Sequence, residues 1–586
     1  MQSRANVALV ALAFALYSPC EASSESFVVE KKGGSLRASV DANAFEAEIR
    51  NAMGEALGCG GHVTDEHLKT IQAALEPMYQ TLPKNTKGRV DRRSLRHLAH
   101  RYFNQKSSLL IRGFEPSRPV SESSWGAAEI LSQRVPGYVE SVLESRHVQE
   151  RGFDIRDAAF MIVTVEQLIF DAESSLLEQI YNRHSKSVQR PLAEAGLKVV
   201  LEDYLVHWLM GDDQEGINLL LETRSLLWES FPHWGKLVSF AEGEVKALQY
   251  QRQQTPELAR HSHGHAGGNA LKPQYSFDDA HAVVGDITKS FASFWESECI
   301  EMKESLITMD PHGTGRVPLS KFYGTGLDSE WRFGESESYL RELGALDETS
   351  SWGKQVIIPN YIQAASNCIV TTSHYMVCCA NDCNPIISDI EKAIGAPTAE
   401  VSQLLSLVRN MTSMTSLEDE SQVTVDATLS AQLESIANSH GGEVPIHSRL
   451  FMQWLHYVFP RDCPFPHKSG TVASVAPLEY KGNYVATVDE MKAHSSQVSQ
   501  EPNSTDLNAT MAKEELQWMS QWSEEEELLA GYEALGKSSS WLSCASCILF
   551  LGACLLGFVG FNRKMDGKMG VKADFLLPTH QKAHFV

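Results

Sequence analysis

The stretch His67-Leu-Lys-Thr-Ile-Gln-Ala-Ala-Leu-Glu-Pro-Met-Tyr79 places apolar residues three and four positions apart. The repeating residues are Leu68, Ile71, Leu75 and Met78. On a helix of 3.6 residues per turn these positions form one apolar stripe. Longer apolar runs follow at 158–177 and 197–221, and few segments show the alternation that is typical of strands. The sequence therefore predicts a mostly α-helical fold.

Two predicted helical domains flank a linker rich in His and Gly at residues 251–275. The first domain covers residues 42–250 and the second covers residues 276–470. Each domain contains the tripeptide Gly-Arg-Val between two amphipathic stretches, at 88–90 and at 315–317. This shared signature indicates that the helical region is duplicated.

The Gly-Arg-Val signatures lie in two loops that resemble EF-hand loops, at 83–94 and 310–321. In the second loop Gly315 stands at the sharp turn, and Val317 is expected to pair with a partner loop at 347–358. A calcium-binding loop ends in a bidentate Glu, but Lys321 stands at that position. We therefore interpret both loops as parts of helix-loop-helix units that have lost calcium.

Weak calcium binding is the alternative interpretation of the second loop, because millimolar affinity suffices outside the cytosol. The ligands would be the side chains of Asp310, His312 and Thr314 and the backbone carbonyl of Arg316. No other cofactor is predicted.

The two ends of the chain predict a type I single-pass membrane protein. Residues 1–22 have the short apolar core of a cleaved signal peptide. Residues 541–561 form an uncharged run long enough to cross a bilayer, and the basic tail at 562–586 marks the cytosolic side. We expect a secretory-pathway membrane, the plasma membrane in particular, with the large domain on the lumenal or extracellular side.

The region before the predicted anchor has two parts of different composition. Residues 471–512 are polar and predict a glycosylated stalk, and residues 513–537 are acidic and predict a juxtamembrane helix. The candidate glycosylation sites are Asn410, Asn503 and Asn508.

The cysteines predict disulfides, because a secretory route exposes them to an oxidising environment. The segment 368–383 is dense in cysteine, and Cys463 is its expected distant partner. The candidates are Cys368, Cys378, Cys379, Cys383 and Cys463. Their connectivity stays open, and the odd number of cysteines outside the leader and the anchor leaves one thiol over. A zinc site that includes Cys379 and Cys383 is the alternative.

Charge and motifs exclude several classes of function. A net charge of −23 argues against a nucleic-acid partner, because phosphate contacts need clustered Lys and Arg. The segment 531–538 matches a phosphate-binding loop by chance, since no buried strand precedes it. His261, His263 and His265 could bind a metal but are more typical of a polar linker. No catalytic motif occurs in a suitable context, which favours a protein that is not an enzyme.

Several phrases of the sequence together resemble a known group of proteins. They are 96–103, 112–116, 339–347, 358–361, 367–368, 377–379, 449–454 and 459–464. They are similar to a family of uncharacterised secretory membrane proteins of dinoflagellate algae, some labelled as EF-hand proteins, over most of residues 65–470. The resemblance implies that the five candidate cysteines form a shared framework, and it brings no known activity.

We expect the helical region to act as a non-catalytic interaction module that binds a protein partner. The alternatives are a low-affinity lumenal calcium-binding protein and a lumenal enzyme of unrecognised type. The sequence leaves the oligomeric state open.

Overall fold

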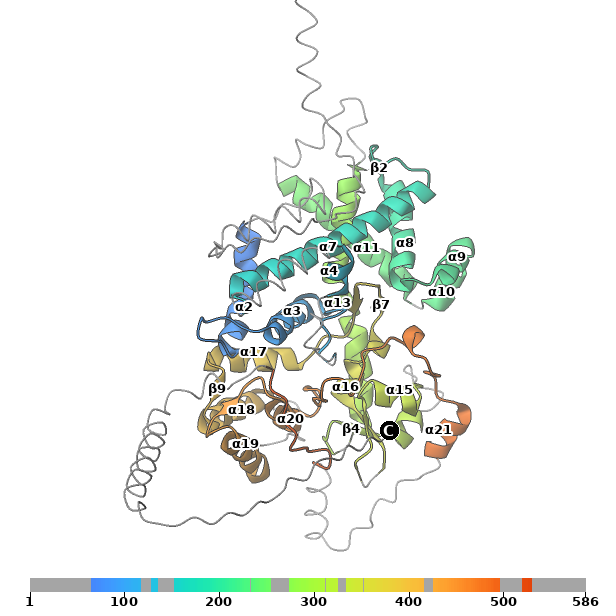
Figure 1. Cartoon of the computed structure of the whole chain (residues 1–586). Helices are drawn as coiled ribbons and strands as arrows, with labels where there is room; N and C mark the ends of the chain where they lie inside the picture. The colour runs from blue at the N-terminus through green and yellow to red at the C-terminus, as the bar shows by residue number, and fades with distance from the viewer. Residues whose placement is uncertain are drawn as a thin grey trace, which may run out of the picture. The chain divides into compact units, whose positions relative to one another are not determined.

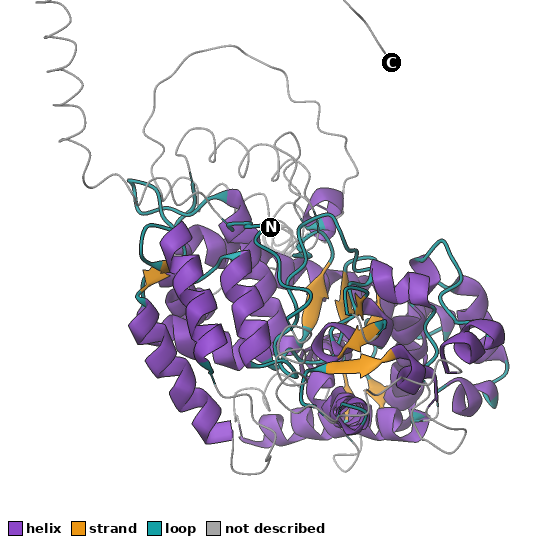
Figure 2. Cartoon of the chain, turned by 90° about the horizontal axis from the view of Figure 1, so that it is seen from below, coloured by secondary structure: helices purple, strands orange, loops and turns teal. Residues whose placement is uncertain are grey.

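The computed structural model describes residues 65–529, with gaps at 117, 119–127, 135–151, 232, 255–272, 311, 325–332, 351–352, 416–424 and 496–518. In these residues the chain is mostly α-helical, as predicted, and its strands are short (Figure 1; Figure 2). None of the helices in these residues has both the length and the apolar composition needed to cross a membrane.

Several predicted features lie outside the described residues. They are the signal peptide at 1–22, the anchor at 541–561, the tail at 562–586, the three linker histidines, Asn503, Asn508 and the segment 531–538. The third candidate glycosylation site, Asn410, is exposed on a helix.

The helices fall into two groups along the chain. The first group is α2 (Asp65–Thr81), α3 (Arg92–Ser107), α4 (Glu129–Arg134), α7 (Ile155–Arg183), α8 (Glu194–Met210), α9 (Gln214–Glu222), α10 (Leu226–Ser230) and α11 (Trp234–Gln254). The second group is α13 (Phe277–Thr308), α14 (Leu319–Gly324), α15 (Glu337–Glu342), α16 (Ile358–Ile362), α17 (Cys383–Ile394), α18 (Val401–Thr415), α19 (Ala427–Ser439), α20 (Arg449–Val458) and α21 (Val488–Ser495). Helix α2 contains the stretch 67–79, and all four residues of its predicted stripe are buried.

Short antiparallel pairings recur along the described chain, and each of the following four joins two segments that lead into helices. Val90 bridges Phe153, ahead of α3 and α7. The other pairings are β2 (Leu192–Ala193) with β3 (Gln274–Tyr275), β4 (Arg316–Pro318) with β6 (Gln355–Ile357), and β9 (Thr398–Ala399) with β10 (Val444–Pro445). In the third, Val317 pairs with Val356, which confirms the partner loop expected at 347–358. Short antiparallel pairings therefore hold the starts of these helices together in pairs.

The two Gly-Arg-Val signatures have the same local backbone. Gly88 and Gly315 have φ angles of 72° and 68°, a left-handed conformation that favours glycine. A Cβ on Gly315 would also collide with the carbonyl oxygen of Pro460. The valine two residues later is fully buried in both loops.

The core consists of three clusters of buried apolar side chains, and α13 connects the first two. Its residues from Ala280 to Phe291 pack with α2, α3, α7, α8 and α11. Its residues from Cys299 to Leu306 pack with α14, α15 and α16. The third cluster joins α17, α18, α19 and α20. A sheet of β1 (Leu109–Ile111), β8 (Tyr375–Val377) and β7 (Val370–Thr371) further links the two predicted domains.

Three disulfides cross-link segments of the second group of helices. They are Cys299–Cys379, Cys368–Cys378 and Cys383–Cys463. All five candidate cysteines are used, and Cys463 is the distant partner of the dense segment, as expected. Cys379 and Cys383 belong to different disulfides, so the alternative of a shared zinc site is wrong. Disulfides of this kind are typical of proteins that fold in an oxidising compartment.

The predicted stalk over 471–512 is wrong for residues 471–495, which pack on the second core. The Tyr339 hydroxyl donates to the Val475 carbonyl over 2.7 Å, and the Ala473 amide donates to the Glu342 carbonyl over 2.9 Å. Ala476 is buried. These polar residues therefore belong to the folded body, because helix α15 supplies partners for their backbone groups.

The predicted helix over 513–537 is wrong for residues 519–529, which form a turn followed by extended chain. We call residues 519–529 the acidic strap. Leu528 forms an antiparallel bridge with Ser448, and the Glu527 carbonyl accepts a 3.0 Å hydrogen bond from the Arg449 amide. Pairing with the segment before α20 replaces the hydrogen bonds that a helix would make.

Candidate functional site

The predicted calcium ligands are only partly brought together. Both oxygens of the buried Asp310 carboxylate accept hydrogen bonds within the loop, from the Thr314 and Gly315 amides at 3.0 and 2.8 Å. The Thr314 hydroxyl donates to the same carboxylate over 3.1 Å. His312 lies at the surface. The Arg316 side chain donates through Nε to Asp347 over 2.9 Å.

A guanidinium from another part of the chain contacts the same carboxylate. Arg461 Nε lies 3.1 Å from Asp310 Oδ2, and Arg461 Nη2 donates to the Asp310 carbonyl over 2.8 Å. A positive charge from the protein therefore stands beside the first residue of the loop. Across the described ranges, no three His, Cys, Asp or Glu side chains are grouped so that they could hold a metal ion.

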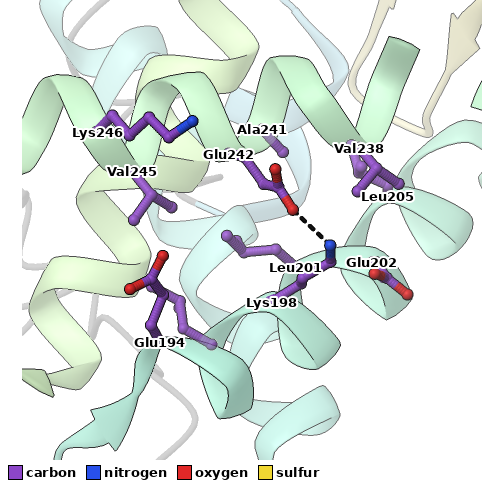
Figure 3. A pocket seen from close by; sticks show the side chains of 11 residues that line it. Glu194, Lys198, Leu201, Glu202, Leu205, Val238, Ala241, Glu242, Val245 and Lys246 are labelled. Atoms are coloured by element: carbon purple, nitrogen blue, oxygen red, sulfur yellow. Dashed lines mark ion pairs between the residues drawn. The ribbon is translucent and has the colours of Figure 1, made fainter. Parts of the chain in front are cut away.

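A small cleft lies between α8 and α11 (Figure 3). It measures about 170 Å³ and is lined by Leu201 and Val245 together with charged side chains. Lys198 Nζ and Glu242 Oε1 lie 2.5 Å apart across it, so these charges neutralise each other. The cleft therefore offers no strong preference for a charged ligand.

A larger cavity of about 430 Å³ lies where α3, α17 and the start of α20 meet the loops after β1 and α20. Figure 1 shows these three helices near one another, although α3 is far from α17 and α20 in the sequence. The volume is within the range of small-molecule sites, roughly 300–1,000 Å³. This cavity is the candidate functional site, and we call it the basic cavity.

Helix α3 presents five basic or imidazole side chains to the basic cavity: Arg93, Arg96, His97, His100 and Arg101. Asp91 caps the start of the helix, and its carboxylate accepts a 2.8 Å hydrogen bond from the Ser94 amide. Residues four apart on a helix lie on the same face, so 96 and 100, and 97 and 101, are neighbours. The local helix therefore concentrates positive charge in one place.

Several buried nitrogen atoms of this group and of Arg449 have no hydrogen-bond partner among the residues that the structure describes. They are Nε and Nη1 of Arg96, Nε2 of His97, Nδ1 of His100, Nε of Arg101 and Nε of Arg449. The Arg96 residue is only 5% exposed, and its Nη2 makes a single long bond of 3.4 Å to the Glu115 carbonyl. A buried polar group without a partner costs roughly 1–3 kcal/mol, so such a concentration requires an explanation.

One buried carboxylate partly balances the positive charge. Arg101 Nη1 lies 3.4 Å from Glu391 Oε1, and His447 Nε2 lies 3.6 Å from the same oxygen. Burial raises the pKa of Glu391 above its ordinary value, although the Arg101 charge acts in the opposite direction. His447 also contacts the Thr81 hydroxyl at 2.9 Å.

The histidines of the basic cavity are neutral at pH 7. Burial, together with the charges of Arg101 and Arg96, lowers the pKa of His100 to about 4. Burial, assisted by Arg101, lowers the pKa of His447 to about 3. Burial is also the main reason that the pKa of His97 lies well below its ordinary value. Neutral imidazoles can donate hydrogen bonds, while the arginines carry the charge.

The acidic strap forms one edge of the basic cavity through Glu527, Leu528 and Leu529. Glu527 lies 3.2 Å from Arg93 Nη2 and accepts a 2.9 Å hydrogen bond from the Ser469 amide. Arg93 and Ser469 therefore hold the Glu527 carboxylate at the rim of the basic cavity.

The basic cavity was not predicted from the sequence, although residues 96–103 contribute to the family resemblance. A usable signal was present, because Arg and His recur at i and i+4 on one helix face. What could not be read from the sequence is that α17, residues 447–449 and the strap close over this face. The chain matches no protein-family model, no curated protein and no solved structure. The resemblance to the dinoflagellate proteins therefore stays a prediction.

Proposed function

We propose that residues 65–529 form a non-catalytic binding module whose basic cavity holds an anionic ligand. The single observation that carries this proposal is the group of cationic side chains, Arg96, Arg101 and Arg449, that lines a cavity of small-molecule size. An anion in the cavity would balance their positive charge and accept charge-assisted hydrogen bonds from their guanidinium groups.

The proposal is consistent with the strong negative charge of the whole chain. A net charge of −23 disfavours attraction of anions to the general surface. A buried cluster of arginines in a low-dielectric cavity acts at short range, however, where Coulomb interactions are strongest. Such a protein would select an anion by its fit to the cavity and not by its charge alone.

The predicted topology gives this module its setting. With a signal peptide at 1–22 and an anchor at 541–561, the cavity would face the lumen or the outside of the cell. The protein would then act as a membrane-bound glycoprotein that recognises its ligand, and a protein partner could present that ligand.

The melting temperature of the purified full chain in different anions tests the proposal. Phosphate, sulfate, acetate and octanoate are compared with chloride at constant ionic strength. At saturation we expect at least one of them to raise Tm by roughly 2–4 °C over chloride. The rise should be lost in Arg96→Gln and retained in Arg190→Gln, a matched change at an exposed arginine outside the cavity.

For each variant, the Tm in the test anion is compared with the Tm of the same variant in chloride, because Arg96→Gln can change the stability by itself. If no anion shifts the Tm of the unmodified chain, or if both variants respond equally, anion binding in the basic cavity is rejected.

A calcium-binding function is the second candidate, and the paired loops of β4 and β6 favour it. This arrangement of helix, loop and short strand is expected of EF-hand-like pairs. The position of Arg461 opposes it, since its guanidinium already lies beside the Asp310 carboxylate. Titration calorimetry of the full chain with millimolar calcium decides the matter: measurable heat that Asp310→Asn abolishes would support calcium binding.

A further inference from the structure

The walls of the basic cavity are largely apolar, although its charged groups define its name. The apolar residues that line it are Phe114, Pro116, Leu343, Ala364, Ala365, Ile387, Met452, Pro464, Phe465, Pro466, Val472, Ala473, Leu528 and Leu529. Phe114, Leu343, Ile387 and Phe465 are each at most 9% exposed. Most of the surface that a ligand would meet is therefore hydrocarbon.

The charged and apolar residues come from different elements. The cationic side chains belong to α3 and to Arg449 at the start of α20. The apolar residues come mainly from the region of α16 and α17, from residues 464–473 and from the acidic strap. A cavity with cationic side chains on one side and an otherwise apolar wall suits a ligand that has an anionic group and a hydrocarbon body.

A small hydrated anion would leave the apolar wall in contact with water. An anion with a hydrocarbon body would cover that wall and gain roughly 25 cal/mol for each Å² of apolar surface buried. The strap favours the anion with a hydrocarbon body, because Leu528 and Leu529 extend the apolar wall. The Glu527 carboxylate is bound to Arg93 and Ser469 at the rim.

We propose that the ligand of the basic cavity is an amphipathic aliphatic carboxylate, with its carboxylate at Arg96 and its hydrocarbon chain along Ile387, Phe465 and Leu528. This inference rests on the proposed function, since it specifies which anion the cavity binds. Arg96 supplies the charge, and the neutral imidazoles of His97 and His100 supply further donors.

Equilibrium dialysis of the full chain tests the inference with three radiolabelled probes: dodecanoate, 1-dodecanol and inorganic phosphate. The chain is kept in one amphipathic polymer at one concentration, so that partition into the polymer is the same for every variant. We expect one saturable dodecanoate site per chain, and little binding of dodecanol or phosphate.

Three variants locate the site. Arg96→Gln should weaken dodecanoate binding by about tenfold or more, because a charge-assisted hydrogen bond is lost. Ile387→Asn should weaken it as well by placing a polar group in the apolar wall, whereas Arg190→Gln should bind like the unmodified chain.

The outcomes separate the inference from the proposed function. If phosphate binds at Arg96 and dodecanoate does not, the amphipathic ligand is rejected and the anion site stands. If dodecanol binds as well as dodecanoate, or if the three variants bind dodecanoate equally, the inference is rejected. If neither anion binds, the inference and the proposed function both fail.

Discussion

The Arg461 guanidinium donates to the Asp310 carboxylate, with 3.1 Å between Nε and Oδ2. Asp310 is 2% exposed, and it is the first residue of the loop whose sequence resembles a calcium-binding loop. Arg461 lies 151 positions further along the chain, just after α20. The contact therefore joins the second and third core clusters through a charge pair at this loop.

Removal of this guanidinium should destabilise the protein strongly. Arg461→Gln leaves the Asp310 carboxylate buried without its charged partner, and breaking a buried pair in this way costs roughly 3–5 kcal/mol. Urea unfolding followed by circular dichroism measures the loss. In a double-mutant cycle, Asp310→Asn should lower the free energy of unfolding less in the Arg461→Gln variant than in the unmodified chain. Strictly additive effects would mean that the two side chains are not coupled.

Glu173 should make stability depend on pH. Its carboxylate accepts hydrogen bonds from Thr288 at 2.6 Å and Tyr375 at 3.0 Å, but burial dominates and raises its pKa to about 7. The folded protein then holds a proton that the unfolded chain releases above its ordinary pKa of 4.5. This contribution is complete below pH 4.5 and is lost as pH rises to about 7, by about 3 kcal/mol in total.

Glu173→Gln should remove that dependence, because the amide stays neutral at every pH. Comparison of its Tm with that of the unmodified chain between pH 5 and 8 measures the effect. Glu178→Gln, a change at an exposed glutamate on the same helix, is the control and should keep the original pH profile. An unchanged profile in Glu173→Gln contradicts the assignment.

The disulfides should contribute unequally. Cys299–Cys379 closes a loop of 80 residues, whereas Cys368–Cys378 closes a loop of 10. If the main effect is on the entropy of the unfolded chain, the longer loop gives about 2 kcal/mol more stability. Unfolding of the double variants Cys299→Ala/Cys379→Ala and Cys368→Ala/Cys378→Ala in urea checks the difference. Equal losses would show that loop length is not the controlling factor.

The acidic strap should loosen when Glu527 loses its charge. Glu527→Gln removes the ion pair with Arg93 and weakens the bond to the Ser469 amide, with an expected loss of roughly 1 kcal/mol. Amides of residues 519–529 should then exchange hydrogen about fivefold faster in mass spectrometry. The control is Glu524→Gln, since Glu524 is exposed. If exchange becomes faster only in Glu524→Gln, Glu527 is not the residue that holds the strap.

Local patterns of the sequence predicted a good part of the fold. The stripe of α2 was visible because helix periodicity is a property of neighbouring residues. The pairing of Val317 with Val356 could be expected because a loop with glycine at its turn leaves one apolar residue free to pair. The disulfide partner Cys463 was suggested by the cysteine cluster, whereas Cys299 gave no local signal on its helix.

Other features depend on contacts between distant segments. The acidic strap reads as a helix in isolation, but its backbone pairs with Ser448 and its glutamates meet Arg93 and Lys468. Residues 471–495 read as a stalk because their composition is polar, yet α15 and the second core hold them.

The sequence by itself determined that this chain is mostly helical, that Gly315 stands at a sharp turn, and that the clustered cysteines form disulfides, because each of these follows from residues close to one another or from residue type. Only the tertiary structure decided that Arg96, His97 and His100 lie in a cavity with Arg449, Ile387 and Phe465. Burial and loss of hydrogen-bond partners arise only when segments hundreds of residues apart pack together, and they are what turns a basic helix face into a candidate binding site.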